Sequence, residues 1–114
     1  MMGLTFKNFE VKKSREAEES ASLEFMIDSG AVYSLVQSDI LDKLGIKPYK
    51  TVDFTLADGT KINRNVGDAY FGYLGEGGAA PVMFGQDGDR PLLGVTALEV
   101  SDWYIILLKE SCIP

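Results

Sequence analysis

Apolar residues alternate with polar ones in several short stretches of this chain, and a period of two is typical of half-buried β-strands. The alternation is clearest where Leu23, Phe25 and Ile27 are separated by Glu24 and Met26. The last predicted strand, 103–108, does not alternate. It is apolar at every position, which predicts a strand covered on both faces. In all, the pattern predicts strands over 4–11, 23–27, 34–36, 52–56, 61–62, 68–74, 80–84 and 103–108.

One segment follows a helical period instead. Ile40, Leu41 and Leu44 share one helical face, Ser38 is a suitable N-cap, and Gly45 is suited to the left-handed conformation that ends a helix. A single helical turn is also expected over 96–100. The pattern as a whole predicts an all-β fold with one short helix. At 114 residues the chain is too short for two ordinary domains, so we expect a single domain over 1–114.

Two turns separate the central strands. Asp58-Gly59 is the kind of two-residue turn that tight hairpins prefer, and it predicts a hairpin between 52–56 and 61–62. Glycines over 75–78 predict the next turn, because glycine adopts positive φ without strain. Nucleotide-binding glycine loops lead directly into a helix, whereas Pro81 and strand-like residues follow here, so a phosphate loop is not expected.

The composition and charge of the chain argue against two classes of partner, nucleic acid and membrane. An apolar fraction of 46% with 25% charged residues is typical of a folded globular chain. A net charge of −6 and the lack of a basic cluster among aromatics argue against nucleic acid. The longest apolar run is far shorter than the roughly 20 residues that cross a bilayer, so no membrane partner is expected. With no signal-like N-terminus and a single cysteine, Cys112, the expected compartment is the cytoplasm.

The chain contains no histidine. Ser-His-Asp and Cys-His catalysis both need an imidazole base, and most catalytic zinc sites use an imidazole ligand. An enzyme built from this sequence would therefore rely on carboxylate, lysine, tyrosine or hydroxyl groups. We expect neither a metal nor another cofactor.

The most informative motif is Asp28-Ser29-Gly30, which begins where the predicted strand 23–27 ends. These three residues are common turn formers, and the motif alone carries little information. The residues around the motif make it more informative: Ala31 follows it, and an apolar-apolar-glycine segment, 92–94, lies some sixty residues further on. Together with 34–36, 41–46 and 57–59, this order of segments resembles the retropepsin-like aspartic peptidases, most closely their small bacterial and archaeal members.

The resemblance covers most of the chain, from about residue 4 to residue 99, and implies the acid protease fold, in which each chain forms a closed β-barrel half of the enzyme. It implies an aspartic endopeptidase acting on peptide or protein substrates, with a glycine-bearing hairpin over 56–61 as a flap and 92–94 as a loop supporting the active-site turn. The site residues it implies are Asp28 as the catalytic residue and, for substrate binding, Ser29, Gly30, Ala31, Ala57, Asp58 and Gly59.

A single Asp-Ser-Gly per chain has a consequence for assembly. Activating water for attack on an amide needs one carboxyl as base and another as acid, which two carboxyls achieve when they are close enough to share a proton. The second carboxyl must then come from the same residue of a symmetry mate, so a homodimer is expected. Retroviral members have an acidic residue after the alanine and an arginine after the supporting glycine. Val32 and Val95 stand there instead, so dimer cohesion would depend more on apolar contacts.

Two alternatives stay open. The same fold without turnover would be a peptide-binding module that holds an extended peptide by strand addition. In the other alternative the Asp-Ser-Gly is coincidental and the chain is a structural β domain.

Overall fold

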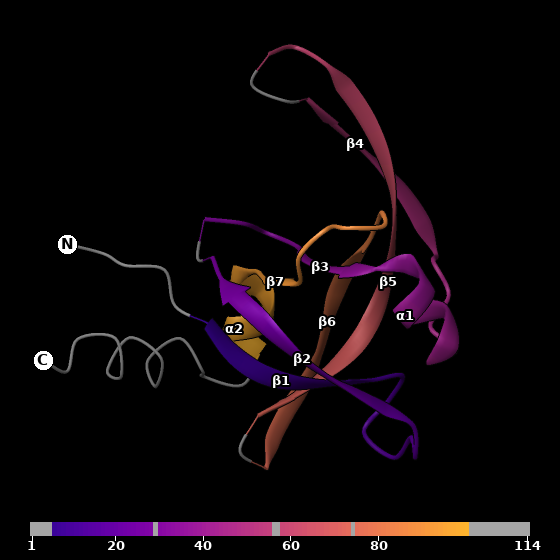
Figure 1. The fold of residues 1–114 in the computed structure, drawn as a ribbon, viewed down its shortest axis with the longest axis vertical. Helices are drawn as coiled ribbons and strands as arrows, with labels where there is room; N and C mark the ends of the chain where they lie inside the picture. Colours follow the sequence, from indigo (N-terminus) through magenta and orange to yellow (C-terminus); the bar gives the residue numbers. More distant parts are fainter. Residues whose placement is uncertain (1–5, 29, 56–57, 74, 101–114) are drawn as a thin grey trace, which may run out of the picture.

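The structure is a computed structural model that describes residues 6–28, 30–55, 58–73 and 75–100. In these ranges the chain is mostly β, with two short helices (Figure 1). The elements are β1 (Phe6–Lys12), β2 (Ser20–Ile27), β3 (Ser34–Gln37), α1 (Ser38–Lys43), β4 (Lys50–Thr55), β5 (Lys61–Tyr73), β6 (Glu76–Gly85), β7 (Leu92–Leu93) and α2 (Val95–Val100).

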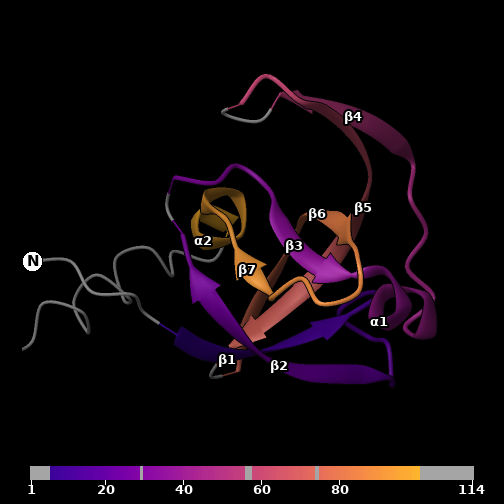
Figure 2. The same cartoon turned by 45° about the horizontal axis from the view of Figure 1, so that its top comes forward.

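The strands form one sheet in the order β1-β2-β7-β3-β6-β5-β4. β1 also pairs with β5, through Glu10 opposite Gly72 and Lys12 opposite Tyr70, so the series of pairings returns to its first strand. The sheet therefore curls around its own core, with α2 beside β3 and β6 (Figures 1 and 2). β4 pairs with the first half of β5, and this hairpin extends beyond the curled sheet (Figure 2).

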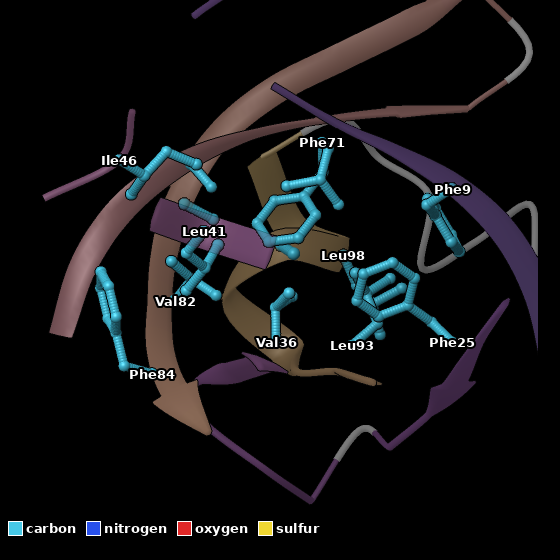
Figure 3. Close-up of a cluster of buried hydrophobic side chains, with 14 residues drawn as sticks. Phe9, Phe25, Val36, Leu41, Ile46, Phe71, Val82, Phe84, Leu93 and Leu98 are labelled. Atoms are coloured by element: carbon cyan, nitrogen blue, oxygen red, sulfur yellow. The ribbon is translucent and has the colours of Figure 1, made fainter. Parts of the chain in front are cut away.

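The core lies inside this curled sheet and is rich in aromatic rings. Phe25 is fully buried and meets Phe9 and Phe71 edge to face, with ring centroids 5.7 and 5.9 Å apart. Edge-to-face packing adds about 0.5–1.5 kcal/mol per pair to the burial of apolar area. Leu93 of β7 and Leu98 of α2 reach the same cluster (Figure 3), so the core supports the segments beneath the Asp28 turn.

The structure confirms the predicted β class and most of the predicted strands, and it corrects the number of helices. α1 forms in the predicted place, but the predicted Ser38 N-cap is wrong: Ser38 is the first helical residue and its hydroxyl donates to the Gly85 carbonyl, while Gln37 is the cap and makes no side-chain cap hydrogen bond. Residues 95–100 form a second helix of six residues where only one helical turn was expected. The strands predicted over 61–62 and 68–74 are one continuous strand, β5. The polar run Asn63-Arg64-Asn65 led the sequence analysis to end the strand at 62. These residues are polar because they lie on a hairpin that stands away from the core.

Both predicted turns are placed differently. Thr55 pairs with Lys61, so five residues join β4 to β5 where a two-residue Asp58-Gly59 turn was expected. Glu76 pairs with Tyr73, so 76–78 belong to β6 and not to the turn. Gly77 pairs with Gly72 of β5, and glycine is needed at 77 because the Tyr70 ring crosses it: a Cβ there would lie 2.1 Å from the Tyr70 hydroxyl oxygen. The predicted strand 103–108 lies outside the described residues.

Neither helix in the described part of the chain has the length and apolar character needed to cross a membrane.

Candidate functional site

Asp28 occupies the connection between β2 and β3, as the sequence predicts, and its side chain is partly buried. The carboxylate oxygen Oδ1 accepts a hydrogen bond of 2.9 Å from the Gly30 backbone N–H. The Ala31 N–H donates to the Asp28 carbonyl at 3.2 Å, closing a tight turn. The structure thus brings Asp28, Gly30 and Ala31 together in one turn, with the carboxylate held by the backbone.

β7 lies directly beneath this turn, between the two strands that the turn connects. It runs parallel to β2, where Ile27 pairs with Leu93, and antiparallel to β3, where Leu35 pairs with Leu92. The Asp28 N–H donates to the Leu93 carbonyl at 3.0 Å, so the backbone of Asp28 is fixed on β7. The 92–94 segment therefore contacts the Asp28 turn, as a supporting loop would.

The far side of the turn is held by the start of α2. The Val95 N–H donates to the Ala31 carbonyl at 2.7 Å, and the Thr96 hydroxyl donates to the Val32 carbonyl at 2.7 Å. These two bonds brace the turn at Val32 and Val95, where retroviral members have charged residues. The Val32 side chain itself is 61% exposed.

Ser34 and Gly94 complete the support, through a hydrogen bond that the sequence analysis did not predict. Ser34 is fully buried, and its hydroxyl oxygen accepts a 3.0 Å hydrogen bond from the Gly94 N–H. The sequence signal for this contact was Ser34 itself, a polar residue at the start of an apolar strand. Gly94 lies so close to the turn that a Cβ would be 2.6 Å from the Tyr33 carbonyl oxygen and 2.8 Å from that of Ala31.

The predicted flap residues Asp58 and Gly59 lie at the tip of the β4–β5 hairpin. Gly59 has φ +90°, and a Cβ built on it would meet nothing within 4 Å. Asp58 is exposed, and its Oδ1 accepts a 2.9 Å hydrogen bond from the Thr60 N–H. The tip therefore projects away from the curled sheet, and Asp58 and Gly59 do not contact the Asp28 turn in the single chain.

The Thr60 N–H, followed by the Thr60 side chain, lowers the pKa of the Asp58 carboxyl from its ordinary value of 3.8. Because the pKa is depressed in the folded chain, this contact stabilises the tip above pH 3.8, and the stabilisation is lost as pH falls through the lowered pKa. We expect an NMR titration to give Asp58 a midpoint below 3.8. Thr60→Pro removes the N–H, the larger of the two causes, and should raise the midpoint of Asp58. Thr60→Ala removes only the side-chain hydroxyl and should keep most of the lowering. A wild-type midpoint at or above 3.8 would show that Thr60 does not lower the pKa of Asp58.

Close to its tip, the hairpin touches the Asp28 turn through an aromatic pair. Phe54 of β4 meets Tyr33 edge to face, with ring centroids 6.1 Å apart, and Lys50 Nζ lies 5.8 Å from the centre of the same Tyr33 ring. The hairpin arches over the side of the molecule that carries the turn between β2 and β3 (Figures 1 and 2). One of its faces is therefore directed toward the Asp28 turn.

Of the predicted site residues, Ser29 and Ala57 lie outside the described residues. A surface hollow of about 660 Å³ lies elsewhere, between β1 and the end of the β5–β6 hairpin, where Asn8, Ser22 and Tyr70 contribute to its lining. Within the described ranges no group of three or more carboxylate or thiol side chains is arranged to hold a metal ion. The chemistry that the arrangement offers is that of a carboxylate on a rigid turn.

A comparison with protein-family models finds none that matches the chain. A comparison with curated protein sequences finds no match either.

Proposed function

We propose that this protein is a retropepsin-like aspartic endopeptidase that acts as a homodimer, with Asp28 of each chain in a shared site. The observation that carries the proposal is the Asp28 turn: its carboxylate accepts the Gly30 N–H, its backbone is bonded to Leu93, and Gly94 supports it from below. This arrangement supports the interpretation of Asp28-Ser29-Gly30 as the motif of that family and of 92–94 as its supporting loop. They occur in a curled sheet that fits a closed barrel half, under a hairpin that fits a flap.

The proposed reaction follows from two carboxyls that share one proton. The ionised Asp28 takes a proton from water, whose oxygen attacks the carbon of the peptide bond, while the protonated Asp28 of the partner subunit donates to the carbonyl oxygen. The tetrahedral intermediate then breaks its C–N bond as a proton passes to the departing nitrogen. Because the turn is fixed by backbone hydrogen bonds, the carboxylate needs little reorganisation at the moment of reaction.

The proposal is tested by incubating the purified protein with a diverse peptide library at acid and at neutral pH and detecting products by mass spectrometry. We expect internal peptide bonds to be cleaved, and pepstatin to inhibit the cleavage. Peptide binding without products would favour the non-catalytic peptide-binding module. Neither binding nor cleavage would favour a structural β domain.

The homodimer makes a separate prediction at Val32. This apolar side chain is 61% exposed in the single chain and adjoins the turn that the proposed two-fold axis brings face to face with its mate. Val32→Asp would place like charges near each other across that axis, and Val95 stands where retroviral members have the arginine that accompanies their acidic residue. We therefore expect sedimentation to show a dimer for the wild type and mostly monomer for the variant. Ser14→Asp, which adds the same charge at another exposed position, should remain dimeric. A wild-type monomer that still cleaved peptides would rule out the shared site.

A further inference from the structure

The two faces of the β4–β5 hairpin differ in chemistry. On the outer face the Thr51 hydroxyl donates to the Asn65 side-chain oxygen at 3.2 Å, and the Asn63 amide donates to Asp53. These side chains are exposed. Their polar pairs satisfy each other, so the outer face is suited to solvent.

The inner face is the one that carries Phe54, whose ring meets Tyr33 of the Asp28 turn. Residues directly opposite each other in an antiparallel pair project to the same face. Phe54 is opposite Ile62, and Val52 is opposite Arg64. All four side chains are partly buried, unlike their exposed neighbours along each strand. The inner face is thus apolar except for the guanidinium of Arg64.

Arg64 has no anionic partner in the described part of the chain. Its guanidinium Nη1 donates one 2.9 Å hydrogen bond, to the carbonyl of the adjacent Asn63, and no described carboxylate forms an ion pair with it. A guanidinium presents five N–H donors in a planar fork, so most of its hydrogen-bonding capacity is still available to a ligand.

Lys50 adds a second positive charge to the same side. Its Nζ lies 5.8 and 5.7 Å from the ring centres of Tyr33 and Tyr49, and it also forms no ion pair with a described carboxylate. Aspartates of the hairpin do not offset these charges: Asp53 is on the outer face and Asp58 is at the tip. Arg64 and Lys50 thus place two positive charges on the side of the hairpin that faces the Asp28 turn, in a protein of net charge −6.

We propose that Arg64 is a specificity-determining residue that binds the carboxylate of an aspartate or glutamate side chain in the peptide substrate, while Val52, Phe54 and Ile62 contact neighbouring apolar side chains. This inference rests on the proposed function, because it takes the surface under the hairpin to be the substrate-binding surface. An arginine fork binds a carboxylate through two parallel charge-assisted hydrogen bonds. A site built for such bonds discriminates against a neutral analogue, because the guanidinium then loses its partner.

The test compares two peptide libraries, one rich in Glu and Asp and a twin in which each Glu and Asp is replaced by Gln and Asn. We expect the wild type to cleave its preferred acidic peptide at least about tenfold faster, as kcat/KM, than the matched amide peptide. Arg64→Gln should bring this ratio close to one, and Arg64→Lys should give an intermediate ratio. Lys61→Gln removes the same charge from the outer face of the hairpin and should keep the wild-type ratio, whatever its overall rate.

Failure of the inference can be told from failure of the proposed function. Cleavage with no preference for acidic peptides, or with a preference that Arg64→Gln leaves unchanged, overturns the role of Arg64 and leaves the peptidase intact. If no peptide is cleaved, the proposed function fails. The role of Arg64 is then decided by a binding assay, in which fluorescently labelled library peptides are titrated with Asp28→Asn protein. Tighter binding of the acidic library, lost in Asp28→Asn with Arg64→Gln, supports the role; equal binding of both libraries overturns it.

Discussion

Replacing Asp28 with asparagine should abolish peptide cleavage while the chain still folds and dimerises. One substitution removes both the base and the acid of the proposed shared site, because each chain contributes the same residue. We expect kcat to fall by at least about 10⁴-fold. The measurement is cleavage of a peptide found in the library screen, with circular dichroism and sedimentation of the same sample as evidence of an intact fold and dimer.

The turn explains why asparagine is the right replacement. Asp28 Oδ1 accepts the Gly30 N–H at 2.9 Å, and an asparagine side-chain oxygen can accept the same bond. Asp28→Ala removes that acceptor as well as the charge, and should cost up to about 1 kcal/mol more in the free energy of unfolding. Equal loss of activity in both variants, with lower stability only in Asp28→Ala, separates the chemical role of the carboxyl from its role in the turn.

Two outcomes would contradict this account of Asp28. If Asp28→Asn unfolds the chain, the aspartate is a structural turn residue and the peptidase proposal loses its main support. If Asp28→Asn cleaves peptides at the wild-type rate, the catalytic group is another residue.

The part of the fold around Asp28 could be predicted because its signals are local. Alternation at Leu23, Phe25 and Ile27 defines β2, and Asp28-Ser29-Gly30 ends it with residues that favour a turn. The helical spacing of Ile40, Leu41 and Leu44 and the Gly45 signal likewise locate α1, and Gly45 adopts φ +80° just after the helix, although the cap is Gln37 and not the predicted Ser38. In these segments each residue's preference depends mainly on its own neighbours in the chain, so one sequence contains the necessary information.

The segments that were misjudged depend on distant partners. β5 continues through Arg64 because β4 pairs with it there, and it then changes partner to β6 and β1 beyond Val66. Gly77 belongs to a strand because it pairs with Gly72 of β5, where the Tyr70 ring occupies the place of a Cβ. Neither fact is visible in a window of adjacent residues. That no described carboxylate forms an ion pair with Arg64 could not be predicted for the same reason, since it depends on which face of the hairpin each carboxylate occupies.

Gly94→Ala should destabilise the protein by about 1–3 kcal/mol, the usual cost of forcing an extra methyl group into a packed site. The new Cβ would lie 2.6 Å from the Tyr33 carbonyl oxygen and 2.8 Å from that of Ala31, distances at which backbone must move. The segment that must shift is the Asp28 turn, which Gly94 also holds through its hydrogen bond to Ser34. We therefore expect Gly94→Ala to lower peptide cleavage more than its loss of stability explains. Urea unfolding at one fixed protein concentration, with activity measured well below the transition, separates the two effects.

The matched control for this prediction is Gly72→Ala. Gly72 also lies in an extended segment, but its nearest contacts, on Glu10 and Glu76, are 3.7 Å from an added Cβ, an ordinary van der Waals distance. Alanine is there expected to be neutral or slightly stabilising, because glycine loses more backbone entropy on folding. A Gly94→Ala variant as stable and as active as Gly72→Ala would show that the turn carrying Asp28 does not rest on 92–94. The supporting-loop interpretation would then be wrong, and with it a main structural argument for an aspartic peptidase site.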